Sequence, residues 1–245
     1  MTVSFIVTSY NYSKYIEETI NSIKNQTFKN IEIIVVDDCS KDDSADILKK
    51  IDGIKLILHD KNKGQLAAII SGLREASGEY ICIIDSDDTL LPEYTQTLLD
   101  EIRSNNAALV VCNAQNNQEL TVKNAPFGGW WWTPMSCGMI KKESINCLLN
   151  YKNTKLWKIC PDKFIFNLAH LQGNSKTIKK HLVIKREHGK NAGKTPFRFF
   201  INIKNNFIIR QEALKLIKNP ELRRIITKSY THIFQQIINF CNTKL

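Results

Sequence analysis

The sequence lacks the features of a secreted or membrane-spanning protein. No apolar run approaches the roughly 20 residues that a helix needs to cross a bilayer. The N-terminus has neither a basic segment nor a small-residue cleavage site. The seven cysteines are scattered, with no C-x-x-C pair and no spacing typical of zinc ligands. We therefore expect a soluble or peripheral cytoplasmic protein whose cysteines are reduced and mostly buried.

Acidic residues are scarce in the last quarter of the chain. Residues 179–245 hold 15 basic and 3 acidic side chains, whereas residues 1–178 hold 19 basic and 21 acidic ones. The net charge of +10 therefore belongs to the C-terminal region alone. A length of 245 residues suits one domain, with or without an appendage.

The first half of the chain alternates short apolar runs with amphipathic helical patterns. The expected strands are residues 3–8, 31–36, 54–58, 80–84 and 107–112. Apolar runs of this length between helices favour an α/β fold whose mostly parallel sheet is covered by helices on both faces. Ligands bind such a sheet beyond the carboxyl ends of its strands.

The second half of the chain is less regular. The composition of residues 113–134 predicts a long loop. The loop includes Trp130-Trp131-Trp132, whose rings would either contact the acceptor or pack in the protein, and the sequence favours neither role over the other. A helix over 162–171 and a strand over 177–185 follow. Residues 194–245 form a basic amphipathic appendage, in which Asn219-Pro220 separates two helices.

An acidic run, Asp85-Ser86-Asp87-Asp88, follows the fourth expected strand. Three carboxylates within four residues repel one another unless a cation or hydrogen bonds offset their charge. Mg²⁺ and Mn²⁺ prefer oxygen ligands, often one or two carboxylates together with phosphate oxygens and water. The run therefore favours a metal–diphosphate site. The alternative is a solvated turn in which Asp88 or Thr89 caps the next helix.

Two other strand ends also carry polar side chains. Thr8 ends the first expected strand, and Tyr10 and Asn11 follow it; Thr8 and Tyr10 would line a base pocket or simply pack. Asp37 and Asp38 follow the second strand, and their carboxylates would accept hydrogen bonds from a ribose hydroxyl or a base N–H, or cap the following helix.

Four motifs occur in a fixed order along the first 92 residues. They are T-S-Y-N at 8–11, V-V-D-D-x-S at 35–40, N-K-G-Q-x-A-A at 62–68 and G-E-Y-I-x-x-x-D-S-D-D at 78–88. As a set they resemble the inverting glycosyltransferases of family 2, which have the Rossmann-like GT-A fold. The match is dense over 2–92, continues loosely to about 193 and omits the last fifty residues.

The resemblance implies a fold, an activity and a cofactor. It implies a glycosyltransferase domain over 1–193, with a nucleotide-sugar half over 1–112 and an acceptor half over 113–193, followed by the appendage. It further implies inverting transfer of a sugar from a nucleoside-diphosphate-sugar, with UDP favoured, to a hydroxyl of a glycan or lipid-linked acceptor. The cofactor would be Mn²⁺ or Mg²⁺, and the pathway would be surface polysaccharide or lipooligosaccharide biosynthesis.

The resemblance also implies roles for individual residues. The donor-binding set would be Thr8, Tyr10, Asn11, Asp37, Asp38, Gly64, Asp85 and His188. The D-x-D residue Asp87, with Asp85 or Asp88, would hold the metal. Asp162 would be the general base that deprotonates the acceptor hydroxyl, although Pro161 replaces the acidic residue that commonly precedes it. Glu143 is a rival base that is better explained as a first-turn residue.

Other functions remain as alternatives. A nucleotidyltransferase of related fold would grip a triphosphate with a Gly- and Arg-rich loop after the first strand, but residues 8–12 contain neither residue type. A nucleic-acid-binding protein would suit the pI of about 9.2 but not the acidic strand ends. A glycosyltransferase-like domain without activity is a third alternative. The basic appendage would contact an anionic membrane, or pack on the domain or a partner copy.

Overall fold

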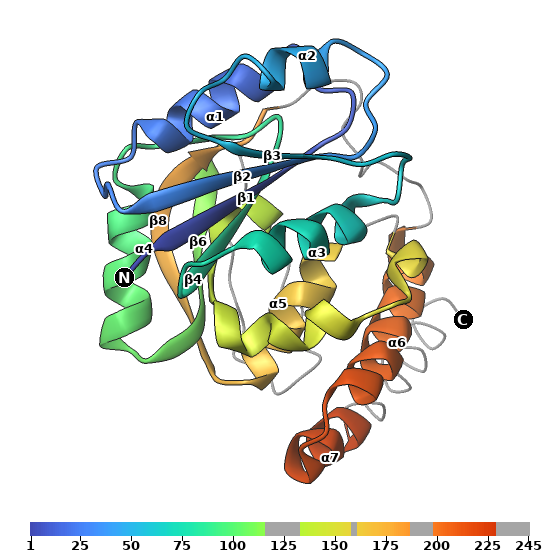
Figure 1. Cartoon of the computed structure of the whole chain (residues 1–245). Coiled ribbons are helices and arrows are strands. Elements are labelled where there is room, and N and C mark those ends of the chain that lie inside the picture. Colours follow the sequence, from blue (N-terminus) through green and yellow to red (C-terminus); the bar gives the residue numbers. More distant parts are fainter. Residues whose placement is uncertain (116–132, 158–160, 187–197, 229–245) are drawn as a thin grey trace. The chain divides into compact units, whose positions relative to one another are not determined.

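The computed structural model describes residues 1–115, 133–157, 161–186 and 198–228, with side chains in the last range from residue 207 onward. The chain forms two compact units (Figure 1). One comprises Met1–Thr121 and Trp132–Glu187, and the other comprises Val122–Trp131 and His188–Leu245. The boundary predicted after residue 193 lies outside the described residues, as do Trp130, Trp131 and Trp132.

The first unit is built on a sheet whose described strands follow the order β3-β2-β1-β4-β7-β6-β8-β5 (Figure 1). The strands are β1 (Val3–Ser9), β2 (Ile31–Asp37), β3 (Lys55–Leu58), β4 (Tyr80–Asp85), β5 (Thr89–Leu90), β6 (Ala107–Gln115), β7 (Gly138–Lys141) and β8 (Asn174–Ile184). β1 to β4 pair in parallel, as do β6 and β8, whereas β7 and β5 run antiparallel to their neighbours. The predicted mostly parallel sheet is confirmed, and the short strands β5 and β7 are additions that the sequence patterns did not predict.

Helices cover both faces of this sheet (Figure 1). The α-helices of this unit are α1 (Ile16–Lys24), α2 (Ser44–Leu48), α3 (Gln65–Glu75), α4 (Tyr94–Ser104) and α5 (Pro161–Leu171). Three 3₁₀ segments, η1 (Met135–Cys137), η2 (Lys142–Asn150) and η3 (Thr154–Leu156), lie between β6 and α5 in the chain. The predicted helix over 162–171 is therefore confirmed as α5.

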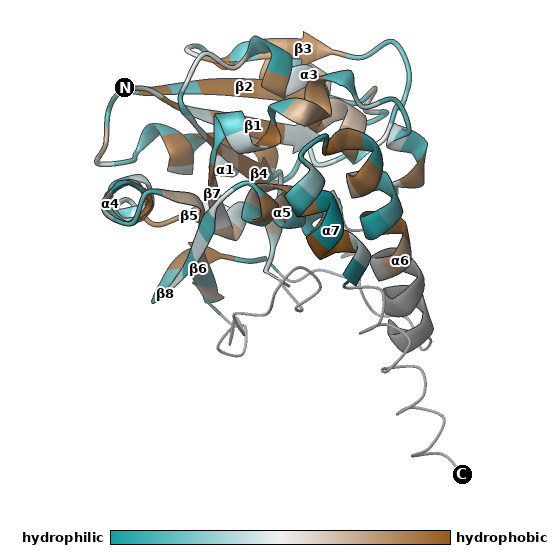
Figure 2. Ribbon diagram, turned by 90° about the horizontal axis from the view of Figure 1, so that it is seen from below, coloured by the Kyte–Doolittle hydropathy of each residue, from teal (hydrophilic) through white to brown (hydrophobic). Residues whose placement is uncertain are grey.

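β1 is buried along its whole length because its two faces pack against different layers. Phe5 belongs to the core cluster that also contains Ile20 of α1 and Leu98 of α4. Ile6 points to the other face, where Gly72 of α3 comes so close that a Cβ added there would lie 2.5 Å from Ile6 Cγ2. Apolar side chains of alternating direction thus fix β1 between two layers, and Figure 2 shows hydrophobic residues along the neighbouring strand β2.

The register of the parallel strands brings three polar strand ends to one edge of the sheet. Thr8 of β1 lies opposite Asp85 of β4, and Ser9 lies opposite Asp37 of β2. The edge at which ligands bind to such sheets therefore carries the residues that the sequence singled out.

The second unit contains α6 (Arg198–Leu216) and α7 (Pro220–Lys228), which contact each other. Asn219 caps α7, because its side-chain Oδ1 accepts hydrogen bonds from the backbone N–H groups of Glu221 (2.9 Å) and Leu222 (3.2 Å). Pro220 occupies the first helical position, where its missing N–H costs nothing. The helix break predicted at Asn219-Pro220 is confirmed. Among the described helices, none has the length and apolar character needed to traverse a bilayer.

Candidate active site

The acidic run is a buried turn at the end of β4. Asp87 and Asp88 are only 8% and 2% exposed, and the N–H of Asp88 donates to the carbonyl of Asp85 (3.2 Å). The Ser86 hydroxyl donates to the carbonyl of Thr8, and the Ser86 carbonyl accepts from Thr19 Oγ1 (2.9 Å). The turn is therefore fastened to β1 and α1.

The alternative of a solvated, helix-capping turn is wrong. The next helix, α4, begins at Tyr94, with Glu93 rather than Asp88 or Thr89 at its N-cap position. Instead, the Asp88 carboxylate accepts a hydrogen bond from the hydroxyl of Ser136 in η1 (2.7 Å). Asp87 and Asp88 are therefore buried in the protein, and Asp85 is partly buried.

Burial raises the pKa values of two carboxyl groups in this turn. Burial raises the pKa of Asp88 to about 6, and the hydrogen bond from Ser136 works in the opposite direction. The pKa of Asp85 is raised well above its usual range by burial and then by the charges of Asp88 and Asp87. A cation at this turn would offset the repulsion that raises these values.

Gln65 joins this turn to the start of α3. Its Nε2 donates to Asp85 Oδ1 (2.7 Å) and lies 3.4 Å from Thr8 Oγ1. Three sequence-distant side chains therefore meet at one point of the sheet edge. Gln65 was not among the predicted site residues, although it directly follows Gly64 in the N-K-G-Q motif.

Asp38 holds the loop that leads into α3. The residue is 3% exposed. Its carboxylate accepts hydrogen bonds from the backbone N–H groups of Lys63 (2.8 Å) and Gly64 (2.7 Å). Asp38 Oδ1 also lies 2.6 Å from Nδ1 of His59, whose Nε2 lies 2.9 Å from Ser71 Oγ. Asp38 was predicted to bind the nucleotide-sugar, but in the structure its carboxylate is occupied by contacts with the protein itself. His59 is a partner of Asp38 that the sequence did not reveal.

Asp37 and Asn11 tie the first two strand-end loops together. Asp37 accepts from the backbone N–H (2.8 Å) and the hydroxyl (2.5 Å) of Ser40, which are bonds within the loop and not a helix cap, since α2 has Asp43 at its N-cap position. Asn11 Oδ1 accepts from the N–H of Lys41 (2.6 Å), and the N–H of Asn11 donates to Ser40 Oγ (2.9 Å). Asn11 itself adopts a left-handed backbone with φ of 63°.

Two tyrosines of the first strand-end loop differ in their surroundings. Tyr10 is 42% exposed. Tyr12 was not predicted as a site residue, yet its pKa is raised to about 12 by burial and then by the charges of Asp87, Asp85 and Asp88. Tyr12 therefore belongs to the neighbourhood of the acidic run.

Asp162 lies in the first turn of α5 and acts electrostatically on the acidic run, since its charge contributes to the raised pKa of Asp85. Its Oδ1 accepts from the N–H of Lys163 (2.9 Å). Burial raises the pKa of Asp162 to about 6, against the opposing influence of Lys163 and Lys185. The structure thus brings the predicted base toward the predicted donor site.

The structure gives less support to the two remaining candidate residues, Glu143 and His188. Glu143 is a surface residue in η2 whose side chain is 69% exposed and pairs with Lys141 (2.7 Å), which does not favour it as a base. His188 lies outside the described residues. Arg186 is the last described residue before His188 in the chain. It pairs with Glu18 (2.5 Å), and its Cζ lies 4.9 Å from the ring centroid of Tyr15.

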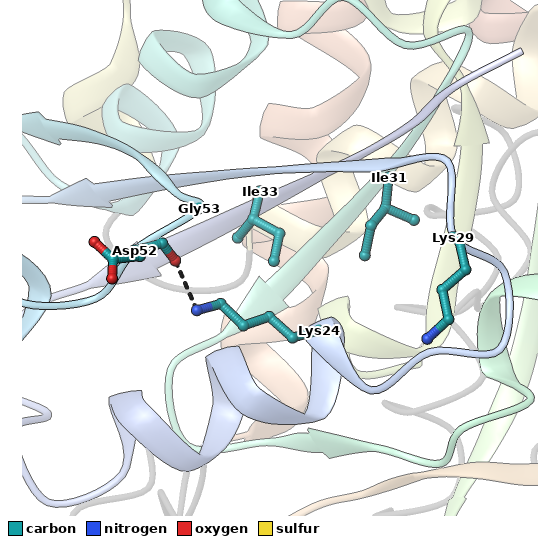
Figure 3. A pocket seen from close by; sticks show the side chains of 6 residues that line it. All are labelled: Lys24, Lys29, Ile31, Ile33, Asp52 and Gly53. Atoms are coloured by element: carbon teal, nitrogen blue, oxygen red, sulfur yellow. Dashed lines mark hydrogen bonds between the residues drawn. The ribbon is translucent and has the colours of Figure 1, made fainter.

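A separate pocket of about 350 Å³ lies elsewhere in this unit (Figure 3). Ile31 and Ile33 at the start of β2 form its apolar lining, and Lys24 Nζ donates to the carbonyl of Asp52 (2.6 Å) at its rim. Because it lies at the amino end of β2, it is distinct from the edge where Thr8, Asp37 and Asp85 end their strands.

A family model described as Glycosyl transferase family 2 matches residues 4–156. An uncharacterised glycosyltransferase of Nostoc is 29% identical over 215 residues, covering 78% of this chain and 66% of that protein. The UDP-Glc:alpha-D-GlcNAc-diphosphoundecaprenol beta-1,3-glucosyltransferase WfaP of Escherichia coli is 44% identical over 88 residues, which are 35% of each chain. The chain spans from one third to two thirds of the length of the first curated relatives that it matches.

Solved structures share the fold. Residues 1–349 of TarS from S. aureus in complex with UDP superpose with a TM-score of 0.69 at 22% identity, covering 96% of this chain and 72% of that one. The mannosyltransferase PcManGT from Pyrobaculum calidifontis, in complex with GDP-Man and Mn²⁺, gives a TM-score of 0.63 at 18% identity, with 94% and 69% coverage. The predicted GT-A fold is confirmed, and the nucleotidyltransferase and nucleic-acid-binding alternatives gain no support.

The hydrogen bonds of Asp38 generate a prediction about stability. Asp38→Ala leaves the N–H groups of Lys63 and Gly64 without their buried acceptor, and we expect a loss of about 3 kcal/mol in the free energy of unfolding. Denaturant unfolding without nucleotide measures this loss. The matched control is Asp46→Ala, since Asp46 is 70% exposed in its pair with Lys49 and should leave stability unchanged. Equal stability of Asp38→Ala and the wild type would show that Asp38 does not hold the loop.

Proposed function

Since the chain belongs to glycosyl transferase family 2, we propose that it transfers a sugar from a nucleoside-diphosphate-sugar to an acceptor hydroxyl, with inversion at the anomeric carbon. The observation that carries this proposal is the convergence of Thr8, Gln65 and the acidic run at one sheet edge. That edge is where such sheets bind nucleotides.

The donor in this proposal is a UDP-sugar. Support comes from the names of two similar proteins, because TarS was solved with UDP and WfaP uses UDP-Glc. Thr8, Tyr10, Asn11 and Asp38 would contact the nucleoside side of the donor. Of these, Tyr10 has the exposure that a base-stacking residue needs.

The acceptor in this proposal is a glycan or a lipid-linked sugar, as in the lipid-diphosphate acceptor that the name of WfaP states. The product would then serve surface polysaccharide or lipooligosaccharide synthesis. Asp162 would take the proton of the attacking hydroxyl, since it lies on a different element from the donor residues and yet acts on Asp85.

A divalent ion, Mn²⁺ or Mg²⁺, fits the residues at the turn. Asp85, Asp87 and Asp88 supply the oxygen ligands that such ions prefer, and the pKa values of Asp85 and Asp88 are raised by burial and then by neighbouring carboxylate charge that a cation would offset. Within the described ranges no group of three or more Asp, Glu, His or Cys side chains has a metal-binding arrangement. Because a group of three is not found there, we propose two protein ligands, Asp87 together with Asp85 or Asp88. Phosphate oxygens of the donor and water would supply the remaining ligands. When bound, the ion would neutralise the departing diphosphate.

The second unit contributes a basic surface to this proposal. On α7, Ile225 is 37% exposed beside the exposed Arg224, a pairing of apolar and cationic groups that suits an anionic membrane surface. We propose peripheral contact of the appendage with the inner face of the cell membrane. This contact would bring the enzyme to a lipid-linked acceptor.

Membrane contact predicts binding that depends on lipid charge. In co-sedimentation, the protein should pellet with vesicles that contain anionic lipid and stay in the supernatant with neutral vesicles. Salt should release it, because the Debye length falls from about 10 Å at 0.1 M to about 3 Å at 1 M. Arg224→Glu should weaken the binding, whereas equal pelleting with both vesicle types would contradict an electrostatic contact.

Asp87→Asn tests the metal assignment. Removing one carboxylate charge from the ligand set should abolish sugar transfer, measured by product formation from UDP-sugars, even at saturating Mn²⁺ or Mg²⁺. Asp60→Asn is the control, because Asp60 is a 73% exposed side chain paired with Lys63. Near-normal turnover of Asp87→Asn would remove Asp87 from the metal site.

Asp162→Asn tests the general base. The variant should bind UDP and metal as the wild type does while transfer falls by roughly 10²–10⁴-fold. Because the ionised form of Asp162 is the active one and its pKa is raised to about 6, the wild-type rate should fall as the pH drops below that value. Glu143→Gln should retain activity. Loss of UDP binding in Asp162→Asn would assign this residue to the donor instead.

A further inference from the structure

Ser136 is a buried hydroxyl that contacts two members of the acidic run. The residue is 0% exposed and lies in η1, remote in sequence from the motifs that identify the donor site. Its Oγ accepts a hydrogen bond from the backbone N–H of Asp85 (3.0 Å) and donates to Asp88 Oδ2 (2.7 Å). One side chain therefore bridges both ends of the acidic turn.

The direction of both hydrogen bonds follows from the chemistry of the partners. A backbone N–H can only donate, so the Ser136 oxygen must accept from Asp85. A hydroxyl carries a single proton, and an ionised carboxylate only accepts. The proton of Ser136 is therefore committed to Asp88, which fixes the rotation of the hydroxyl and, through it, the orientation of the Asp88 carboxylate.

The place of Ser136 in the fold explains how it reaches the turn. β7 pairs antiparallel with β4, with Met139 opposite Cys82 and Ile140 opposite Ile81. Continuing this register by three residues places Ser136 opposite Asp85. The ladder ends before that point because residues 135–137 turn into η1. The serine side chain then supplies the acceptor for the Asp85 N–H in place of a neighbouring strand.

The bridge also joins the two halves of the catalytic unit. η1 belongs to the half that was predicted to receive the acceptor, whereas Asp85 and Asp88 belong to the nucleotide-sugar half. Gln65 holds the Asp85 side chain from the α3 side, and Ser136 holds the turn from the β7 side. The carboxylates are thus fixed from two directions before any ligand binds.

We propose that Ser136 is a positioning residue for sugar transfer, which fixes the Asp85–Asp88 turn so that its carboxylates meet the metal–diphosphate in one geometry. This inference rests on the proposed function. Ser136 touches neither substrate nor metal in this account, and it acts through Asp88 and the main chain of Asp85. Mutation of a residue that hydrogen-bonds to a metal ligand typically lowers metal affinity or activity by about 10–100-fold.

The test compares Ser136→Ala with Ser144→Ala. Ser144 is a matched control, because it is also buried, at 4% exposure, lies in the neighbouring 3₁₀ segment η2 and donates its hydroxyl to the carbonyl of Lys141 (2.6 Å). Ser136→Ala loses the two hydrogen bonds of its hydroxyl and Ser144→Ala loses one, so both should lower the thermal unfolding midpoint. Only Ser136→Ala should lower kcat/KM for the donor, by roughly 10–100-fold.

A second measurement separates positioning from general destabilisation. Calorimetric titration with UDP and Mn²⁺ should show weaker binding for Ser136→Ala and unchanged binding for Ser144→Ala, at a temperature where both are folded. In an Asp88→Asn background, adding Ser136→Ala should weaken UDP–Mn²⁺ binding by a smaller factor than it does in the wild type, since residues that act through one another are not additive.

Three results would decide against the inference. Wild-type kcat/KM in Ser136→Ala would overturn it, and so would equal losses of kcat/KM in the two serine variants. A full multiplicative loss in the Asp88→Asn background would show that Ser136 does not act through Asp88. Failure of the proposed function looks different, because the wild type itself would then neither bind UDP with Mn²⁺ nor transfer a sugar.

Discussion

Repulsion among Asp85, Asp87 and Asp88 is the constraint around which the catalytic unit is organised. Two of the three residues are under 10% exposed, and burial raises the pKa values of Asp85 and Asp88. Hydrogen-bond donors from other elements hold this unfavourable arrangement, namely the Gln65 amide from α3 and the Ser136 hydroxyl from η1. A folded protein keeps such a concentration of like charge where a cationic ligand offsets it.

The sheet makes this arrangement possible because it aligns the ends of sequence-distant strands. The register between β1 and β4 sets Thr8 opposite Asp85, and the close approach of Gly72 to Ile6 brings α3 onto β1. Gln65 begins that helix and so reaches both strand ends. Packing in the core thereby determines which polar groups meet at the edge, and a donor with two phosphates and a metal would bind where they meet.

The sequence predicted the parts of the fold that local patterns encode. Apolar runs predicted the strands of the nucleotide-binding half, and Asn219-Pro220 predicted the break between α6 and α7. The two-residue strand β5 and the four-residue strand β7 were missed because they are too short for a periodic pattern and are held by antiparallel pairing with distant strands.

The same distinction applies to the site. Asp85 and Asp87 were singled out because they stand in a motif, and the charge of Asp162 acts on Asp85. His59, Gln65 and Ser136 were not predicted, since their importance comes from partners 20 to 51 residues away in the chain. His59 and Ser136 carry no local signal, and although Gln65 stands in the N-K-G-Q motif, only the fold shows which carboxylate it holds.

The account is tested most directly by calorimetric titration of UDP into the wild-type protein, with Mn²⁺ and with a chelator. If the acidic turn holds a metal–diphosphate, UDP should bind at least about tenfold more tightly with Mn²⁺, a difference of roughly 1.4 kcal/mol. Equal affinity under both conditions, or no binding of UDP at all, would contradict the donor site assigned to Asp85, Asp87 and Asp88.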